Sequence, residues 1–555
     1  MNGAQALLQT LADAGIEVCF TNPGTSEMHF VAALDSEPRM RAVLALFEGV
    51  ATGAADGYAR MADKPAATLL HLGCGLGNGL ANLHNARKGR VPVVNIVGDH
   101  AIYHTQYDAQ LQSDIETVAR NVSPGFVRTS ASTAQLSQDA VDAVKAAQGL
   151  PGQVATLILP ADVSWGEGAQ SCAMPARRAA PVADDSVVQA IVQAIQNGNQ
   201  SGGKTALLLG GQALREPGLL AAARIAAQAG VKLLAEVFPT RLTRGVGLPP
   251  VERIAYLAEM AGVQLADIQH LILVDAKAPV SFFAYPGKPS YLVPDSCTVH
   301  TLSSPEQDAP ASLTKLAVAL GASQAQPQLQ AAQRPGRPRG KLTAPKVCKA
   351  VGHLLPENAI LIDEAITSGL MLGAMTAGCP RHDLITLTGG AIGQGLPNAV
   401  GAAVACPDRP VVALIGDGTA MYTIQALWSM AREHLHVVNI IFNNASYSVL
   451  NVELERVGAG SGGDKARAQL DLDGPRLNFA QLAQGMGVHA VRTNSAEDFT
   501  KALEYALTHP GPHLIEALVP ESLSGAKRKV LPWLLRSLPN LPRPLAQALK
   551  RKIAP

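Results

Sequence analysis

Short runs of valine, isoleucine and leucine alternate with longer alanine-rich stretches along most of the chain. The alanine-rich stretches, such as GVATGAADGYARMAD and NAVGAAVAC, have helical spacing. The apolar runs are mostly bounded by glycine, aspartate or asparagine: ATLLHL, VPVVNIVGD, VATLILP, TALLLGG, HLILVDA, VVALIGDG and VVNIIFNN. Short buried strands that alternate with helices are typical of parallel sheets covered on both faces. The pattern therefore predicts an α/β fold made of doubly wound parallel sheets.

Two hydrophilic, linker-like segments divide the chain into parts of similar size. Residues 166–184 are small, polar and proline-bearing, and residues 322–345 form a Gln/Pro/Arg-rich run that is typical of an exposed linker. We therefore predict three domains, at about residues 1–165, 185–322 and 345–525.

The remaining segment, residues 526–555, is a tail with eight basic residues and no acidic one. Apolar and basic residues interleave in its VLPWLLRSL run. Two interpretations stay open: a tail packed on the protein's own surface, or a segment that contacts a membrane surface or covers an active site.

The overall charge is nearly balanced, with 45 basic and 44 acidic residues. No global field would attract nucleic acid, so we expect no nucleic-acid partner. The seven cysteines are scattered and lack CxxC spacing, which argues against a disulfide framework or a zinc site. The N-terminal stretch lacks the features of a signal peptide, and no apolar run reaches the roughly 18 residues that span a bilayer. These observations predict a cytoplasmic protein.

The strongest local signal is the pair of strands that end at Gly416-Asp417-Gly418 and at Asn443-Asn444. Asn444 follows Asp417 by 27 positions. The carboxyl ends of parallel strands open on one edge of a sheet, where α/β proteins bind ligands. Asp417 and Asn444 can therefore meet at one ion.

A carboxylate, an amide oxygen and the backbone carbonyl of Ser446 form an all-oxygen ligand set. Mg²⁺ prefers such ligands in octahedral geometry and shares its other positions with phosphate oxygens and water. Gly416 and Gly418 let backbone N–H groups approach phosphates closely. The segment is thus suited to a magnesium ion with a diphosphate.

The segment from Val411 to Leu450 resembles the thiamine diphosphate signature of the family that contains acetolactate synthase, pyruvate oxidase, pyruvate decarboxylase and benzoylformate decarboxylase. The resemblance extends to about residue 520. It implies that thiamine diphosphate and Mg²⁺ are the cofactors, with Asp417, Asn444 and Ser446 at the metal. We also assign Tyr447 to cofactor binding.

The stretch TGGAIGQGLPNAVGAAVA, residues 388–405, is similar to the segment that precedes the Gly-Asp-Gly strand in this family. By resemblance, Gly390 lies beside the aminopyrimidine ring of the cofactor. Ile392 is the bulky residue that bends the cofactor into a V shape. The alternative is an ordinary glycine-rich turn that enters a helix.

Glu48 follows an apolar strand and begins the helix of GVATGAADGYAR. A glutamate at this place can simply stabilise the helix N-terminus. The resemblance implies more: Glu48 hydrogen-bonds the pyrimidine and favours the imino tautomer, which deprotonates thiazolium C2 to the reactive carbanion. Burial raises a carboxyl pKa, so such a group can share a proton with a ring nitrogen.

Two further candidates come from the likeness to benzoylformate decarboxylase. FTNPGTSE places Thr25 where that relative has a substrate-binding serine, and His71 matches a catalytic histidine. The sequence also departs from this relative. Its second active-site histidine has no counterpart in APVSFFAYPGKPSYL, and Val449 and Glu453 replace residues near an aromatic pocket. We therefore expect a small or polar 2-oxo acid at least as much as an arylglyoxylate.

The resemblance implies a 2-oxo acid decarboxylase that acts through the C2 carbanion and an enamine. An acetolactate synthase-type carboligase is the alternative, and a non-catalytic cofactor-binding partner protein is a third hypothesis from another class. FAD could bind in the middle domain, but we do not favour it, because Gly210-Gly211 alone is a weak motif for nucleotide binding. The resemblance also implies a homodimer or homotetramer, with Glu48 of one chain facing Asp417 and Asn444 of another.

Overall fold

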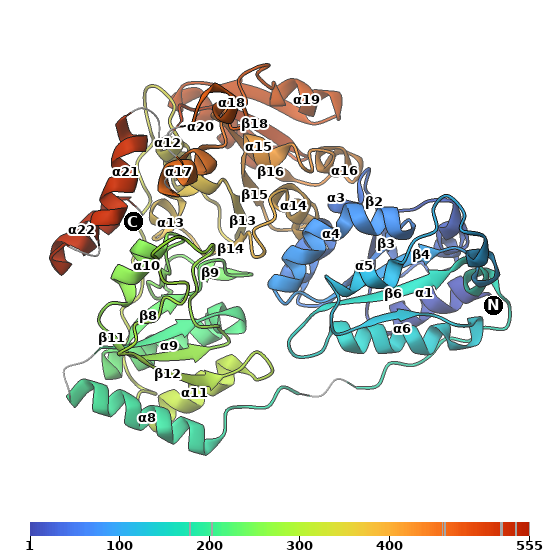
Figure 1. Ribbon diagram of the computed structural model, residues 1–555, viewed down its shortest axis with the longest axis horizontal. Coiled ribbons are helices and arrows are strands. Elements are labelled where there is room, and N and C mark those ends of the chain that lie inside the picture. The colour runs from blue at the N-terminus through green and yellow to red at the C-terminus, as the bar shows by residue number, and fades with distance from the viewer. Residues whose placement is uncertain are drawn as a thin grey trace.

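The computed structural model describes residues 1–176, 179–200, 204–457, 459, 462–521, 526–538 and 541–553. Their strands form three sheets, each flanked by helices (Figure 1). The first sheet has six parallel strands in the order β2-β1-β3-β4-β6-β5. These are β1 (Val18–Asn22), β2 (Arg41–Leu44), β3 (Ala66–Leu70), β4 (Val93–Asp99), β5 (Val127–Thr129) and β6 (Val154–Pro160).

The second sheet has five parallel strands in the order β10-β8-β7-β11-β12. These are β7 (Lys204–Leu209), β8 (Lys232–Ala235), β10 (Glu252–Arg253), β11 (Ile268–Val274) and β12 (Thr298–Ser303). The third sheet has seven strands in the order β17-β18-β16-β15-β13-β14-β9. These are β9 (Leu242–Arg244), β13 (Ala359–Glu364), β14 (His382–Thr386), β15 (Val411–Gly416), β16 (Val437–Asn443), β17 (His489–Thr493) and β18 (His513–Leu518).

The three α/β sheets confirm the predicted fold class, with one antiparallel strand as a difference. Strand β9 comes from the middle segment of the chain and pairs antiparallel with β14 of the third sheet. It covers the backbone groups that an edge strand would otherwise leave unpaired. This pairing could not be predicted from the sequence, because the three residues of β9 show too little periodicity. The limits of the three domains stay a prediction.

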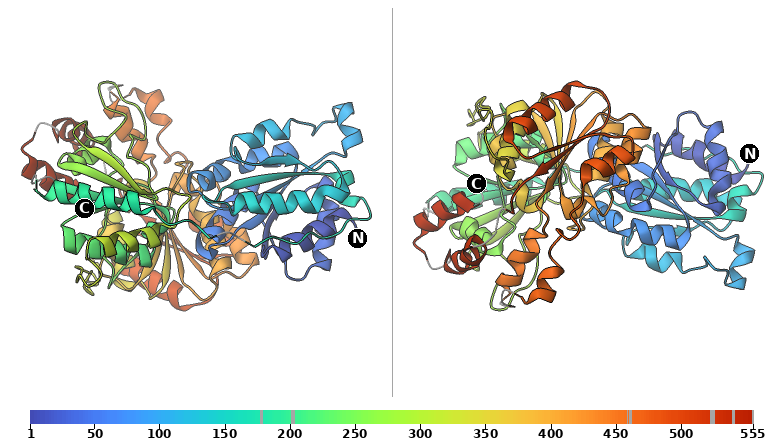
Figure 2. Two further views of the ribbon diagram at one scale, coloured as in Figure 1. Left: turned by 90° about the horizontal axis from the view of Figure 1, so that it is seen from below. Right: turned by 90° about the horizontal axis from the view of Figure 1, so that it is seen from above.

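Helices α3 (Glu48–Ala62) and α14 (Gly395–Ala405) join the first and third sheets. Figure 2 shows the N-terminal part of the chain meeting the C-terminal part at this junction. The helices approach closely because glycines face each other. A Cβ at Gly57 would lie 2.3 Å from the carbonyl oxygen of Asn398, and one at Gly401 would lie 1.9 Å from that of Ala54.

The basic tail contains helices α21 (Ala526–Ser537) and α22 (Arg543–Ile553). Leu531, Leu535 and Leu538 are buried against Met260 and Val452. Lys550 Nζ lies 2.7 Å from Glu252 Oε1, and Arg543 pairs with Asp267. Five of its basic side chains lie outside the described residues: Lys527, Arg528, Lys529, Arg536 and Lys552. The described contacts support a tail packed on the protein's own surface.

Among the helices that the structure describes, none combines the length and the apolar character needed to cross a bilayer.

The close approach of α3 and α14 predicts that Gly401→Ala lowers the thermal unfolding temperature. The new methyl group would overlap backbone atoms of α3, including Tyr58 N at 2.4 Å. Overpacking of this kind typically costs about 1–3 kcal/mol. Gly262→Ala is the matched control, because a Cβ there meets nothing within 4 Å. It should keep or raise the unfolding temperature, since alanine is favoured over glycine in a helix. Equal unfolding temperatures for the two variants would contradict the packing argument.

Candidate active site

Asp417 lies at the carboxyl end of β15 and contacts the end of β16. The two strands pair in parallel, with Gly416 opposite Phe442. Asp417 Oδ2 accepts hydrogen bonds from the backbone N–H of Asn444 at 2.9 Å and of Ala445 at 2.6 Å. The structure therefore brings together the two strand ends that the sequence singled out.

The carboxylate of Asp417 is oriented by these backbone donors. Burial raises its pKa, and the N–H groups of Gly418, Ala445 and Asn444 act in the opposite direction. Gly418 N lies 2.8 Å from Asp417 Oδ1. Both carboxylate oxygens thus have fixed directions, and each can accept a further partner because a carboxylate oxygen has two lone pairs.

The turn after β16 is tight and includes a left-handed residue. Ala445 has a φ of 56°, which is uncommon for a residue other than glycine. Asn444 Oδ1 accepts a hydrogen bond from Ser446 N at 2.9 Å. A Cβ at Gly418 would lie 2.3 Å from Cε1 of Tyr447, so the tyrosine ring packs directly on Gly418. Strained backbone of this kind concentrates at functional sites.

The loop of residues 388–394 approaches the same edge of the third sheet. Gly390 and Gly393 have φ values of 77° and 96°, so both positions favour glycine. A Cβ at Gly390 would lie 2.5 Å from Cζ of Phe282, and one at Gly393 would lie 2.6 Å from Cβ of Tyr422. Ile392 is half-buried between the two glycines.

Glu364, the last residue of β13, anchors the end of this loop. It accepts hydrogen bonds from the N–H groups of Gly393, Gln394 and Gly395, at 2.8, 3.0 and 2.6 Å. Burial raises the pKa of Glu364 to about 7, against the opposing effect of the three donors. Sequence reasoning missed this residue, because an acidic strand end has no distinctive spacing.

In the N-terminal part, Glu48 is the first residue of α3 and is 8% exposed. Its Oε2 accepts a hydrogen bond from Asn78 Nδ2 at 3.0 Å. Asn78 belongs to α4 (Leu72–Lys88). A Cβ at Gly75 would lie 3.0 Å from Glu48 Oε1 and 3.5 Å from Cβ of His71. Glu48 and His71 are therefore neighbours across the first turn of α4.

His71 is held by a buried carboxylate that the sequence analysis did not single out. Its Nδ1 lies 2.8 Å from Oε2 of Glu27, which is 1% exposed. The same oxygen accepts a hydrogen bond from Gly24 N at 2.7 Å. Thr25, by contrast, is exposed at the start of the short helix η1 (Thr25–Glu27). The sequence signal that could have pointed to Glu27 was its position, because it is an acidic residue two positions after Thr25 in the same loop.

The two halves remain separate within one chain. Among the described residues, no hydrogen bond or ion pair joins the side chain of Glu48 to Asp417 or Asn444. Asn82 hydrogen-bonds to both halves, because its Nδ2 donates to Gly49 O at 2.8 Å and to Gly393 O at 3.2 Å.

Glu453 takes part in a contact with the middle of the chain. It lies on α17 (Ser448–Arg456), where its carboxylate accepts from Tyr285 Oη at 2.8 Å and pairs with Arg456 at 2.7 Å. Val449, on the same helix, is half-buried. The charge of Glu453 is therefore compensated by a basic neighbour.

Two parts of the chain match models of known protein domains. Residues 1–119 match the model described as thiamine pyrophosphate enzyme, N-terminal TPP binding domain. Residues 370–517 match the corresponding C-terminal TPP binding domain. The two matches cover the segments that contain Glu48 and Asp417.

Similar sequences cover nearly the full length. A protein of Mycobacterium tuberculosis named "Putative acetolactate synthase large subunit IlvX" is 55% identical over 527 residues, which cover 95% of this chain and 100% of that protein. The benzoylformate decarboxylase of Pseudomonas aeruginosa is 28% identical over 92% of this chain and 97% of its own length.

A solved structure shares the fold. The thiamine diphosphate-dependent 4-hydroxybenzoylformate decarboxylase of Rhodococcus jostii RHA1 matches with a TM-score of 0.80 at 23% identity, over 94% of this chain and 100% of that one. The full-length relatives and the two matching domains place the chain among enzymes that are carbon–carbon lyases or carboligases. They leave no support for the non-catalytic alternative. The chain belongs to the thiamine pyrophosphate enzyme family.

Proposed function

We propose that this protein is a thiamine diphosphate- and magnesium-dependent decarboxylase of small 2-oxo acids. The observation that carries the proposal is the group of Glu48, His71 and Glu27 at the carboxyl edge of the first sheet. A decarboxylase must supply a proton to the carbon that loses carbon dioxide. A histidine oriented by a buried carboxylate is suited to that task.

The residues around Asp417 fit the proposed magnesium ion and diphosphate. The ligands would be a carboxylate oxygen of Asp417, the side-chain oxygen of Asn444 and the carbonyl of Ser446, an oxygen set that suits Mg²⁺. The described residues contain no cluster of three His, Cys, Asp or Glu side chains that could hold a metal. A metal here would therefore depend on amide, carbonyl and phosphate oxygens beside the single carboxylate.

When bound, thiamine diphosphate supplies a thiazolium ring that accepts the electrons of the breaking carbon–carbon bond. Gly390, Ile392 and Tyr447 are proposed to hold its rings and Gly416 and Gly418 its diphosphate. Burial of the Glu48 carboxylate beside Asn78 supports a role in sharing a proton with the pyrimidine. Glu48 is thus the proposed activating residue.

His71 and Thr25 are proposed to act on the substrate. Glu27 fixes Nδ1 of His71, which leaves Nε2 as the ring nitrogen for proton transfer. Thr25 is exposed in the same loop and can contact a substrate carboxylate through its hydroxyl group.

An acetolactate synthase-type carboligase is the second candidate. The 55% identity to the mycobacterial relative of that name favours it. The two candidates use the same cofactor chemistry and differ in the electrophile that follows decarboxylation. For a decarboxylase it is a proton, and for a carboligase it is a second carbonyl compound.

The proposed working unit is a homodimer or homotetramer in which Glu48 of one chain faces Asp417 of another. Exposed apolar side chains near each half support this arrangement. Leu46 and Tyr107 are 50% and 68% exposed in the N-terminal half, and Tyr422 is 52% exposed in the C-terminal half. Such side chains are often covered in protein–protein contacts.

We place the protein in the cytoplasm, with no nucleic-acid partner. All seven cysteines are free, as expected in a reducing compartment. Contact between the basic tail and a membrane is a weaker proposal, because the leucines of α21 pack against the protein itself.

We also propose that the middle domain binds no flavin. The N–H groups at the end of β7 are the ones that would hold a nucleotide diphosphate. Here Gly211 N donates to Glu236 Oε1 at 3.3 Å and Gln212 N to Asp275 Oδ2 at 2.7 Å. Arg90 of the first domain pairs with Asp275 and donates to its carbonyl oxygen at 2.9 Å. The carboxylates of Glu236 and Asp275 therefore accept the hydrogen bonds that phosphate oxygens of a nucleotide would accept.

The first prediction concerns the reaction. Protein supplied with thiamine diphosphate and Mg²⁺ should convert a small 2-oxo acid, such as pyruvate, mainly to the aldehyde, measured by separating aldehydes from hydroxyketones. Glu48→Gln should lower turnover by roughly 10²–10⁴-fold, since a proton-transfer group is lost. Glu17→Gln is the control, because Glu17 forms an exposed ion pair. Hydroxyketones as the main product would favour the carboligase, and unchanged turnover in Glu48→Gln would refute the role of Glu48.

The second prediction concerns the cofactor. Asp417→Ala should weaken the binding of thiamine diphosphate with Mg²⁺ by at least about 100-fold, because a metal ligand and the anchor of the Asn444 turn are both removed. Equilibrium dialysis measures this affinity. Asp408→Ala is the control, since Asp408 is exposed on the turn before the same strand. Equal affinities in the two variants would rule out Asp417 as a ligand.

The third prediction concerns flavin. Purified protein incubated with FAD and then passed through gel filtration should show no flavin absorption bands. Asp275, paired with Arg90, accepts the hydrogen bond of Gln212 N, one of the N–H groups that a nucleotide diphosphate would need. Stoichiometric flavin after this treatment would overturn the proposal.

A further inference from the structure

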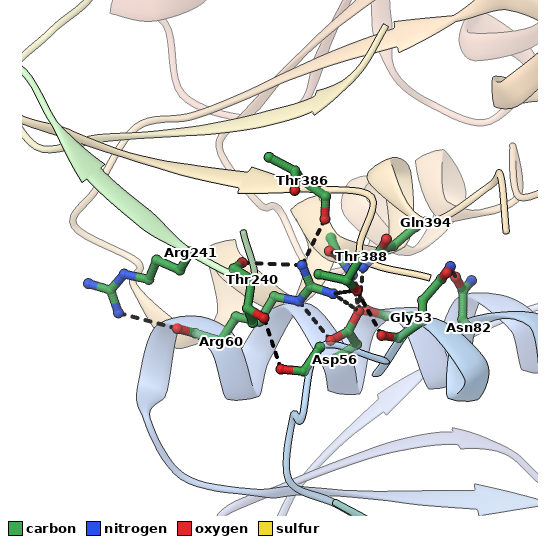
Figure 3. Close-up of polar contacts among 12 residues, drawn as sticks. Gly53, Asp56, Arg60, Asn82, Thr240, Arg241, Thr386, Thr388 and Gln394 are labelled. Atoms are coloured by element: carbon green, nitrogen blue, oxygen red, sulfur yellow. Dashed lines mark hydrogen bonds and ion pairs between the residues drawn. The ribbon is translucent and has the colours of Figure 1, made fainter. Parts of the chain in front are cut away.

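The side chain of Arg60 is fully buried and contacts helix α3, the segment before β9 and the end of β14 (Figure 3). Within α3, its Nε and Nη2 donate to the two carboxylate oxygens of Asp56, each at 2.8 Å. Nη1 donates to the carbonyl oxygens of Thr386, at 2.9 Å, and Thr240, at 3.2 Å. Nη2 also donates to Thr388 Oγ1 at 2.8 Å. These five hydrogen bonds equal the five N–H groups that a guanidinium carries.

The carboxylate of Asp56 extends the network to α14. Asp56 Oδ2 accepts hydrogen bonds from Gln394 Nε2 at 2.6 Å and from Asn398 Nδ2 at 3.2 Å. Asp56 has no exposed side-chain surface, so water competes with none of these contacts. One buried ion pair therefore links helix α3 to both ends of the loop of residues 388–394, through Thr388 and Gln394.

The loop is bonded to the first domain along its length. Thr388 Oγ1 donates to the carbonyl oxygen of Asn85 at 2.7 Å. The side chain of Asn85 donates to Ala391 O at 2.7 Å and accepts from Ala391 N at 3.2 Å. On its other side the loop is bonded to Glu364 of the third sheet. Gly390 and Ile392 are thus placed by contacts with two domains.

We propose that Arg60 and Asp56 are positioning residues that set the place of the 388–394 loop relative to helix α3, and through it the affinity for the cofactor. The inference rests on the proposed function for the roles of Gly390 and Ile392. The link itself rests on the contacts described above. The pair lies in the C-terminal half of α3, the helix that begins at Glu48, and it is bonded to the first turn of α14 through Asn398.

Arginine is required for this arrangement by its geometry. A lysine ammonium has three donors on one atom, so it loses at least two of the five hydrogen bonds that Arg60 makes. Two of the affected acceptors, Thr388 Oγ1 and Thr386 O, lie at the start of the loop. Arg60→Lys keeps the positive charge beside Asp56, which avoids an uncompensated buried carboxylate.

The test compares Arg60→Lys and Thr388→Val with Arg241→Lys as the matched control. Arg241 joins the same domains, but its Nη1 donates to the backbone carbonyl oxygen of Arg60 and it does not contact the loop. Thr388→Val removes one acceptor of Arg60 together with the hydrogen bond from Thr388 to the carbonyl oxygen of Asn85, and it preserves the side-chain shape. It keeps the proposal testable if Arg60→Lys fails to fold.

The first measurement is amide hydrogen exchange by mass spectrometry on the full chain without added cofactor. Exchange in a peptide that covers residues 388–394 should rise roughly tenfold in both test variants, the equivalent of one net hydrogen bond. In both test variants, exchange at residues 416–419 should stay as in the unchanged protein. In the control Arg241→Lys, exchange in both peptides should stay as in the unchanged protein. A similar rise in both peptides would show general loosening and would overturn the proposal, as would no rise in either.

The second measurement is the affinity for thiamine diphosphate with Mg²⁺ by equilibrium dialysis. We expect roughly tenfold weaker binding in both test variants and no change in Arg241→Lys. Unchanged affinity despite faster exchange would overturn the proposed effect on the cofactor. If the unchanged protein binds no thiamine diphosphate, the proposed function fails, and hydrogen exchange still decides whether Arg60 positions the loop.

Discussion

The close packing of α3 against α14 is the contact on which the candidate site depends. Glycines on both helices allow backbone atoms to approach within van der Waals distance, and the Asp56–Arg60 pair closes one side of the contact without water. A charged pair buried so completely is stable only when its remaining donors and acceptors are satisfied. Here the segments around Thr240, residues 386–388 and Gln394 satisfy them, so the pair is fully satisfied only when these segments pack against α3.

This dependence explains how helix α3 and the loop of residues 388–394 are aligned although they belong to different sheets. Parallel strands open their carboxyl ends on one edge, and each half uses that edge. Asp417 fixes the turn after β16, and Glu27 fixes His71 beside Glu48. In each half a buried carboxylate accepts hydrogen bonds from a neighbouring loop. The chemistry thus relies on preorganised polar groups.

The middle segment contributes in a different way. Its strand β9 pairs with the third sheet, its Tyr285 donates to Glu453, and its Asp275 pairs with Arg90 of the first domain. Fold alone does not determine which ligands a domain binds. In this chain the middle domain supports its neighbours through backbone pairing and buried charge, which agrees with a cofactor held only between the first and third sheets.

The sequence by itself determined the fold class, through local periodicity, and the family, through the resemblance of its 411–450 segment to a known signature. It also predicted that Asp417 and Asn444 lie close together, because the carboxyl ends of parallel strands share one edge. Only the tertiary structure decided the partners of His71 and Arg60. Glu27 and Thr388 come from segments that the chain brings together with His71 and Arg60 by long-range packing, and their local sequence does not identify these partners. The antiparallel strand β9 was unpredictable for the same reason. A three-residue strand is fixed by the open edge that it meets in space and has almost no pattern of its own.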